Sequence, residues 1–350
     1  MKEIDRFVHF KFLHQIFSVA VHYLGVRGTL FIFFENGSFF LIKNRLNLNI
    51  KNLNLRKRFS VNNDVFPCLW YNGDAKQSAE FYCSTFGGRI TVDSPVVINI
   101  EIFGQRMMLL NGGPQFEKNA SISFMVLCET EEEIDKYWKP LAADGIVLME
   151  LGEYPWSKKY GWVRDKFGVT WQLYLGEKQG DQTIVPTLMF IHQNNGKALE
   201  AMELYTGVFP NSKITRVLKY GEGLGNEAHE VPENVQHAAF ELDGYAFFCM
   251  DNSYNHKFDF NEGISIVVMT DNQDETDHFW NSLTAGGGEE SRCGWLKDKF
   301  GLSWQIVPKR LLELMNDFRQ PEKAQKVVEA MLQMKKIVIA DLESAYNSKP

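Results

Sequence analysis

Two glutamines occupy matching places in two nearly identical stretches of the chain. Gln172 lies in GWVRDKFGVTWQL (161–173) and Gln305 in GWLKDKFGLSWQI (294–306), and eight of the thirteen letters agree. A carboxamide offers hydrogen-bond donors and an acceptor but carries no charge. These glutamines could therefore orient a ligand, or contribute one oxygen to a metal site, but they could not act alone as an acid or a base.

Few other side chains have the type and spacing for catalysis. Glu101 and Glu241 lie at equivalent places on strand-like runs, His237 lies near the start of such a run in the second half only, and His256 lies in the loop NSYNHKF. Isolated polar residues on an alternating strand or in a loop usually face solvent. We interpret all four as surface residues, and keep Glu241, His237 and His256 as candidates if the protein is an enzyme.

The cysteines and the charge exclude several classes of protein. The five cysteines have no CxxC spacing and are odd in number, which predicts reduced thiols in a cytoplasmic protein. Cys68 and Cys249 lie within strands without an evident histidine partner, so we do not expect a thiolate nucleophile. The net charge of −7 argues against a nucleic-acid partner.

A glycine-rich stretch, YGEGLGNE (220–227), has the composition of a nucleotide-binding turn. Such glycines bind a phosphate or an adenosyl group when they lie between a strand and the start of a helix. Here Pro232 follows shortly afterwards and argues against a helix, so we interpret the stretch as a loop.

The repeated stretch is the end of a much longer repeat. Residues 66–90 align with 185–214, and 119–138 align with 261–280. Each copy reads as a strand, an amphipathic helix and three strands, and this order occurs twice per copy. We therefore predict two domains, 65–178 and 183–308. A tail of three short helices is predicted in 309–350.

The first 64 residues differ in composition from the rest of the chain. They carry ten Lys or Arg against four Asp or Glu, so their net charge is +6. The apolar run 16–34 is interrupted by a histidine, an arginine and two glycines, so we do not predict a membrane span. It also lacks the pattern of a signal peptide. We expect residues 1–64 to be a leader outside the fold, with translation starting downstream of Met1.

The order β-α-β-β-β resembles the vicinal oxygen chelate superfamily, which includes glyoxalases, bleomycin-resistance proteins and dioxygenases. The motifs LWYxGxA, LNGGPxF and GWxxDKFGxxWQ resemble its PhnB-like branch, the 3-demethylubiquinone-9 3-methyltransferase domain family, over about residues 65–347. The resemblance implies an α+β fold of tandem glyoxalase-like domains. In each domain two βαβββ modules would form a cupped sheet around a ligand cleft.

The resemblance also implies where a metal would bind in related enzymes. The positions of the first-strand histidine are occupied by Pro67 and Pro186, and the other strands offer MMLLN, FFCMD, NASISF and NEGISI. Only Gln172 and Gln305 retain a coordinating atom. Because a divalent ion needs several nitrogen or oxygen ligands together, we predict no metal and no cofactor.

Alternation along the strands predicts which side chains line the two clefts. In both domains we expect the tryptophan of the last strand, Trp171 or Trp304, to pack under helices and the glutamine after it to face the cleft. The predicted cleft residues are mostly apolar or uncharged, with Asn111 and Asp251 at the mouths. The full set is Leu69, Tyr71, Asn111, Thr170, Gln172 and Tyr174 in the first domain, and Leu188, Phe190, Asp251, Ser303, Gln305 and Val307 in the second.

A mostly apolar cleft with a few polar groups suits a small organic ligand. We therefore predict a cytoplasmic protein that binds a small molecule in metal-free clefts, with no nucleic-acid or membrane partner and with homodimer formation left open. An enzyme is the alternative, either a methyltransferase as the family label says or a glyoxalase-type lyase or isomerase. A scaffold with vestigial clefts is the third interpretation.

Overall fold

The computed structural model describes residues 64–176, 178, 181–222 and 229–348, together with the backbone of three short strands before them. The chain divides into two units, Met1–Lys57 and Arg58–Pro350. In the smaller unit an antiparallel sheet is formed by β1 (His22–Val26), β2 (Thr29–Phe33) and β3 (Phe39–Lys43). Apart from these strands and Asp64, the predicted leader lies outside the described residues.

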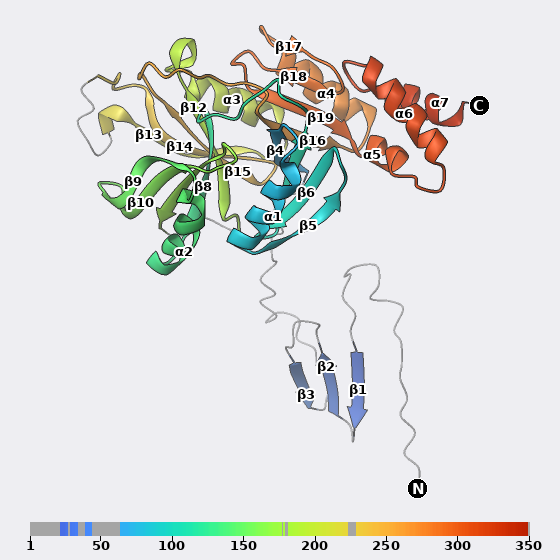
Figure 1. The fold of residues 1–350 in the computed structure, drawn as a ribbon, viewed down its shortest axis with the longest axis horizontal. Helices are drawn as coiled ribbons and strands as arrows, with labels where there is room; N and C mark the ends of the chain where they lie inside the picture. The colour runs from blue at the N-terminus through green and yellow to red at the C-terminus, as the bar shows by residue number, and fades with distance from the viewer. Residues whose placement is uncertain are drawn as a thin grey trace. The chain divides into compact units, whose positions relative to one another are not determined.

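The larger unit contains four βαβββ modules in succession, followed by three helices (Figure 1). Module 1 consists of β4 (Val65–Tyr71), α1 (Ala75–Phe86), β5 (Gly88–Asp93), β6 (Val97–Ile102) and β7 (Gln105–Asn111). Module 2 consists of β8 (Ile122–Cys128), α2 (Glu131–Ala142), β9 (Ile146–Tyr154), β10 (Ser157–Arg164) and β11 (Thr170–Leu175). This order confirms the predicted fold class.

Modules 3 and 4 repeat the pattern. Module 3 consists of β12 (Ile184–Phe190), the short 3-10 helix η3 (His192–Asn194), α3 (Ala198–Val208), β13 (Lys213–Lys219), η4 (Tyr220–Glu222), β14 (Val235–Leu242) and β15 (Tyr245–Asp251). Module 4 consists of β16 (Ile264–Thr270), α4 (Gln273–Thr284), β17 (Glu289–Glu290), β18 (Trp295–Lys297) and β19 (Ser303–Pro308).

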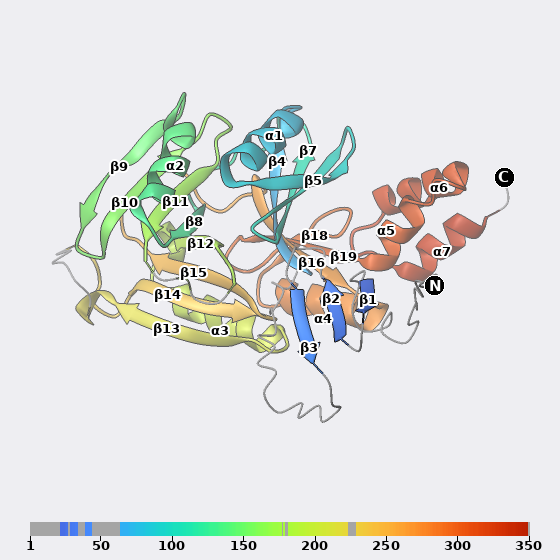
Figure 2. The same ribbon diagram turned by 90° about the horizontal axis from the view of Figure 1, so that it is seen from below.

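The two eight-stranded sheets each combine one module from each half of the chain (Figure 2). Sheet I has the order β17-β18-β19-β16-β4-β7-β6-β5 and joins modules 1 and 4, whereas Sheet II has the order β13-β14-β15-β12-β8-β11-β10-β9 and joins modules 2 and 3. The joins are antiparallel pairs, β4 with β16 and β8 with β12. We expected each half to complete its own sheet, and the structure instead crosses the halves.

The helices of each half pack against each other, although the strands of that half belong to different sheets. Within each half the two helices meet, since the rings of Phe86 and Tyr137 lie 5.3 Å apart and those of Phe209 and Phe279 lie 4.7 Å apart. The helices of each half are therefore packed together, while the first strand of each module pairs with a strand of the other half. Because of this pairing, the four strands β4, β8, β12 and β16 all lie inside a sheet. None of them has an edge of unpaired backbone groups that could associate with another chain.

A buried carboxylate fixes the turn that the sequence repeats. Asp165 accepts hydrogen bonds from the backbone N–H groups of Phe167 (2.8 Å) and Val169 (3.1 Å). Its other oxygen accepts from the hydroxyl of Tyr82 on α1 and from the indole N–H of Trp171, both at 2.8 Å. The carboxylate thus ties the last strand of module 2 to the helix of module 1.

The second half contains the same arrangement around Asp298. The donors are the backbone N–H groups of Phe300 (2.9 Å) and Leu302 (3.1 Å), the hydroxyl of Tyr205 (2.7 Å) and the indole of Trp304 (2.9 Å). The prediction that the tryptophan of this strand packs under the helices is confirmed, because Trp304 is fully buried against Tyr205. Trp171 is equally buried against Tyr82.

The predicted helical tail is confirmed as α5 (Lys309–Met315), α6 (Pro321–Gln333) and α7 (Ile339–Asn347). Its apolar side chains form a small core of their own. The chain leading into α7 is fixed to module 4, because the N–H groups of Cys293 and Gly294 donate to the carbonyls of Met334 and Lys335, both at 2.8 Å. Across the described part of the chain, no helix has the length and apolar character needed to cross a membrane.

Replacing Asp298 by asparagine tests the buried carboxylate. We expect Asp298→Asn to lower the free energy of unfolding at pH 7 by roughly 2–3 kcal/mol, because the amide N–H₂ would meet the donors of Tyr205 and Trp304. Urea denaturation followed by tryptophan fluorescence measures this. Asp274→Asn, which changes an exposed carboxylate on α4, is the control and should change stability by less than about 0.5 kcal/mol. Equal effects of the two variants would contradict the assigned role.

The same carboxyl group makes stability depend on pH. Burial raises the pKa of Asp298 from 3.8 to about 6, and burial also raises the pKa of Asp165. The folded protein therefore holds the Asp298 proton more tightly than the unfolded chain does. The resulting stability is present below pH 3.8 and is lost as the pH rises through about 6.

We therefore expect the stability difference between the wild type and Asp298→Asn to widen by about 2 kcal/mol from pH 7 to pH 4. Parallel urea titrations across this range measure the difference. A difference that narrows toward acid pH would show that the four donors, and not burial, dominate the pKa of this group.

Candidate functional site

Each sheet has one face covered by helices, the helix face, and an opposite inner face. On the inner face of Sheet II, the Nε2 of Gln172 donates to the hydroxyl oxygen of Ser123 (2.6 Å). The Oε1 of Gln172 accepts from the hydroxyl of Tyr160 (2.7 Å). Both ends of this buried amide are therefore occupied by neighbouring strands.

The inner face of Sheet I has a related but different group. Here Gln305 donates from Nε2 to Ser265 (2.9 Å), and the Cys68 thiol lies beside both side chains. Burial raises the pKa of Cys68 to about 12. The thiol therefore stays protonated at neutral pH, as expected from the sequence, and offers a weak hydrogen bond and no nucleophile.

The residues predicted from the tryptophan–glutamine strands lie on the inner faces. Thr170, Gln172 and Tyr174 alternate with Trp171, which contacts the helices, and Ser303 and Gln305 alternate in the same way with Trp304. Tyr174 packs on the inner-face cluster of Sheet II, and Val307 packs on that of Sheet I. Their contact with a ligand stays a prediction.

Four predicted cleft residues lie on the helix faces instead. Leu69, Tyr71, Leu188 and Phe190 belong to the core beneath the helices, and the Tyr71 hydroxyl pairs with that of Ser78 on α1 at 2.6 Å. The prediction failed because both first strands are almost wholly buried on both faces, so apolarity did not reveal which face is which. The inner-face residues of β4 are Phe66 and Cys68.

The two residues predicted at the cleft mouths have structural roles. Asn111 accepts from the N–H of Ala75 (3.1 Å) at the start of α1. Asp251 accepts from the N–H groups of Gly196 (2.8 Å), Ala198 (3.1 Å) and Val235 (2.9 Å). Both side chains therefore satisfy free donors at the beginning of a helix, and Asp251 also binds the N–H at the start of β14. Their contact with a ligand stays a prediction.

Three polar atoms on the inner faces are buried without a hydrogen-bond partner among the described residues. They are Asn99 Oδ1 and Ser303 Oγ on Sheet I, and Trp162 Nε1 on Sheet II. The sequence analysis did not consider Asn99 or Trp162. Asn99 lies between the buried residues Ile98 and Ile100 on β6. Alternation along this strand would therefore have predicted Asn99 on the opposite face, the inner face.

His237 lies on the inner face of Sheet II, and the other candidates for catalysis are engaged at the surface. The His237 ring lies 4.9 Å from that of Phe248, and burial lowers its pKa to about 4, so the imidazole is neutral at pH 7. Glu101 pairs with Arg89 (3.2 Å), and Glu241 pairs with Lys213 (3.2 Å).

His256 has a local partner, because its Nε2 lies 2.9 Å from Asn252 Oδ1. This bond closes the loop after β15. The described part of the chain places no group of three or more His, Cys, Asp or Glu side chains where they could hold a metal ion.

The side chains at the innermost positions of the strands are not those that bind a hard divalent ion. Next to Gln305 these positions hold Cys68, Ser265 and Met108, and next to Gln172 they hold neutral hydroxyl and aromatic side chains. A hard cation prefers several carboxylate or imidazole ligands together. The donor set therefore does not fit the metal of the superfamily's enzymes.

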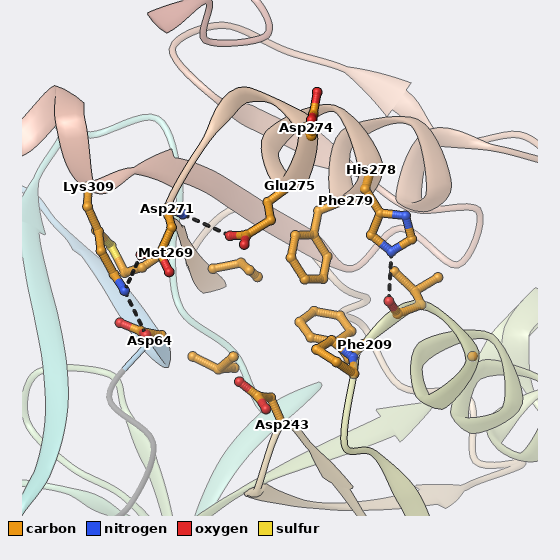
Figure 3. Close-up of a pocket in the computed structure, with 15 residues that line it drawn as sticks. Asp64, Phe209, Asp243, Met269, Asp271, Asp274, Glu275, His278, Phe279 and Lys309 are labelled. Carbon is orange, nitrogen blue, oxygen red and sulfur yellow. Dashed lines mark hydrogen bonds and ion pairs between the residues drawn. The ribbon is translucent and has the colours of Figure 1, made fainter.

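A hollow of about 560 Å³ lies away from both inner faces, near the start of β4 and along α4 (Figure 3). Its rim is acidic, but these carboxylates bind to other parts of the protein. Lys309 lies 2.9 Å from Asp64 and 2.7 Å from Asp271, and Glu275 accepts from the N–H of Asp271 (2.8 Å). Asp243 accepts from Asn211 (3.1 Å). The rim thus holds structural elements together and is a weaker candidate for a ligand site.

Comparison with known proteins agrees with this architecture. The chain matches the family described as 3-demethylubiquinone-9 3-methyltransferase over residues 63–174 and again over 182–307. The YjdN protein of Escherichia coli (strain K12) is 33% identical over 85 residues, which cover 24% of this chain and 58% of YjdN.

Two solved structures illustrate the likeness. The PhnB protein from Bacillus cereus is 37% identical, covers 31% of this chain and 96% of its own, and gives a TM-score of 0.30. Glyoxalase I from Zea mays is 12% identical, covers 69% of this chain and 91% of its own, and gives a TM-score of 0.46. Because the family match covers more than half of the chain, in two successive segments, this protein belongs to the PhnB-like 3-demethylubiquinone-9 3-methyltransferase family.

Proposed function

We propose that this protein binds a small organic molecule on an inner face of its crossed sheets, without a chelated metal. The observation that carries the proposal is the uncharged polar group at the centre of each face, Gln172 with Ser123 and Gln305 with Ser265. A few fixed polar groups in an apolar setting orient a small ligand while the apolar surface supplies affinity.

The surroundings of these amides support the proposal. The inner face of Sheet I carries Phe66, Cys68, Met108, Val267 and Met269 as its buried apolar cluster. The inner face of Sheet II carries Met125, Leu127, Val185, Ala239 and Phe248. Methionines adapt to ligands of different shape, which suits a binding surface better than a rigid core.

The location proposed for the protein is the cytoplasm. All five cysteines are free, and Cys68, Cys128 and Cys249 are buried. Free thiols are typical of a reducing compartment.

An enzyme is the second candidate, and His237 is the observation that favours it. A neutral imidazole on an inner face can accept a proton from a bound substrate. The methyltransferase named by the family would also need a site for its methyl donor. The glycine-rich stretch 220–227 is described only as far as Glu222, where η4 ends, and the remainder lies outside the described residues.

Metal removal tests the metal-free part of the proposal. We expect EDTA to leave the melting temperature of the purified protein unchanged, because removing an ion destabilises only a protein that binds it. Elemental analysis of the same preparation should show no stoichiometric divalent metal. A stoichiometric metal whose removal lowers the melting temperature would overturn the proposal.

Native mass spectrometry tests the ligand itself. We expect a mass excess from a co-purified organic molecule that disappears on denaturation, because a molecule bound to the folded state is released with unfolding. If S-adenosylmethionine raises the melting temperature and no other mass is found, the methyltransferase replaces binding as the leading function.

Substitution of His237 separates binding from catalysis. If the protein only binds its ligand, His237→Gln should leave the co-purified mass in place, because glutamine preserves a neutral hydrogen-bonding side chain. Under the enzyme alternative, the variant should accumulate a mass that differs from the one found in the wild type. His278→Gln, which changes an exposed histidine on α4, is the matched control.

A further inference from the structure

The two inner faces are built from equivalent strands, although β17 and β18 of Sheet I are shorter than β9 and β10 of Sheet II, so the positions of the central strands on Sheet I have counterparts on Sheet II. On Sheet I, one row of neighbouring residues runs in register through Asn99, Met108, Cys68 and Ser265. On Sheet II, the counterpart row runs through Ala239, Phe248, Thr187 and Ser123. Comparing the residues at equivalent positions of the two sheets therefore shows which side chains the fold requires.

The comparison shows that the polar groups of Sheet I are not required by the fold. Asn99 is 5% exposed and its Oδ1 has no partner among the described residues, whereas its counterpart Ala239 has no polar side chain. Ser303 is fully buried and its hydroxyl has no partner in the part of the chain that the structure describes, whereas its counterpart Thr170 donates to the carbonyl of Ile122 (3.2 Å). Each buried polar atom left without a partner costs about 1–3 kcal/mol.

The central glutamines of the two faces also differ, in the hydrogen-bond partner of the side-chain carbonyl. On Sheet II the hydroxyl of Tyr160 occupies the carbonyl of Gln172. The counterpart of Tyr160 is Cys293, which precedes β18 and is held by its backbone to the C-terminal tail. Gln305 therefore lacks the hydroxyl that binds the carbonyl of Gln172, and the weaker Cys68 thiol lies beside it instead. Among the described residues, the inner face of Sheet I has two buried polar atoms without a partner, Asn99 Oδ1 and Ser303 Oγ, and that of Sheet II has Trp162 Nε1.

The apolar groups around this row suit an aromatic ring. Met108 and Met269 are 8% and 7% exposed, and as unbranched side chains they can move aside for a ligand. The ring of Trp70, two residues beyond Cys68 on β4, lies 5.8 Å from that of Trp295. Aromatic side chains of this kind favour a ring as their neighbour.

The charged side chains near the row already have partners. Lys297 lies 2.9 Å from Glu262, Glu101 pairs with Arg89, and Arg106 lies 4.0 Å above the ring of Phe66. A charged ligand would have to compete with these contacts, so the face suits an uncharged molecule.

We propose that Sheet I, and not Sheet II, is the ligand-binding face, and that it takes a neutral aromatic molecule whose N–H or O–H group donates to Asn99 Oδ1. This inference rests on the proposed function and makes it specific. The ligand's donor satisfies the unpartnered amide oxygen of Asn99, and Sheet II has no such oxygen at the equivalent position, because Ala239 lies there.

Indole and N-methylindole test the inference, because they share one ring system and differ in the single N–H donor. In a ligand-observed NMR titration, we expect indole to bind the wild type at least tenfold more tightly than N-methylindole. Asn99→Ala should weaken indole binding at least tenfold and remove the preference between the two probes. The melting temperature of the unliganded variant should stay level or rise, because an unsatisfied polar group has been removed.

The reciprocal variant, Ala239→Asn, places the same amide on Sheet II. We expect it to lower the melting temperature and to leave indole binding as in the wild type. Ser303→Ala provides a second check, since removing its unpartnered hydroxyl should not lower the melting temperature.

Three outcomes would overturn the inference. The first is that indole binds no better than N-methylindole. The second is that Asn99→Ala lowers the melting temperature by several degrees without affecting indole binding. The third is that Ala239→Asn alone abolishes binding, which would assign the ligand to Sheet II. In each case a co-purified mass in the native spectrum would leave the proposed function standing, so the two failures are distinguishable.

Discussion

The buried carboxylates of Asp165 and Asp298 are the interactions on which the architecture depends. Each is surrounded by two backbone N–H groups, one tyrosine hydroxyl and one indole, and each joins the last strand of one module to the first helix of the preceding module. Burial alone would make such a charge costly, and four directed donors are what make the site tolerable. Because these donors come from two modules, neither module can satisfy the carboxylate by itself.

This constraint is compatible with sheets that cross between the halves. Once the helices of one half are joined, the first strands of its two modules lie in different sheets, and each pairs with a strand of the other half. Both inner faces therefore receive side chains from both halves of one chain. A duplicated chain can then change one face without changing the other, since no inner-face position is shared between Sheet I and Sheet II.

The sequence was sufficient for features that depend on local patterns. The repeated DKFG turn, the four modules and the helices of the tail follow from periodicity and turn chemistry, and the structure confirms them. The tryptophan–glutamine strands were also oriented correctly, because a large apolar residue next to an amide distinguishes the two faces. Leu69 and Leu188 were misplaced because their strands are buried on both sides, and the bond of Asn111 to the start of α1 was not predicted because its partner is distant in sequence. Crossing depends on non-local packing, which no local pattern encodes.

Because the architecture is duplicated, the cost of an unsatisfied polar atom on one sheet can be compared with the equivalent position on the other. In a protein with one face, a buried Asn99 oxygen without a partner could reflect a compromise that the fold requires. Here Ala239 fills the same place in the same architecture, so the fold accepts a residue without this cost. A penalty of about 1–3 kcal/mol is a sizeable fraction of the 5–15 kcal/mol that stabilises a typical protein, and random substitution to an apolar residue would remove it. The Asn99 amide on Sheet I is therefore most simply explained by a ligand contact at this position, which the equivalent Ala239 on Sheet II does not make.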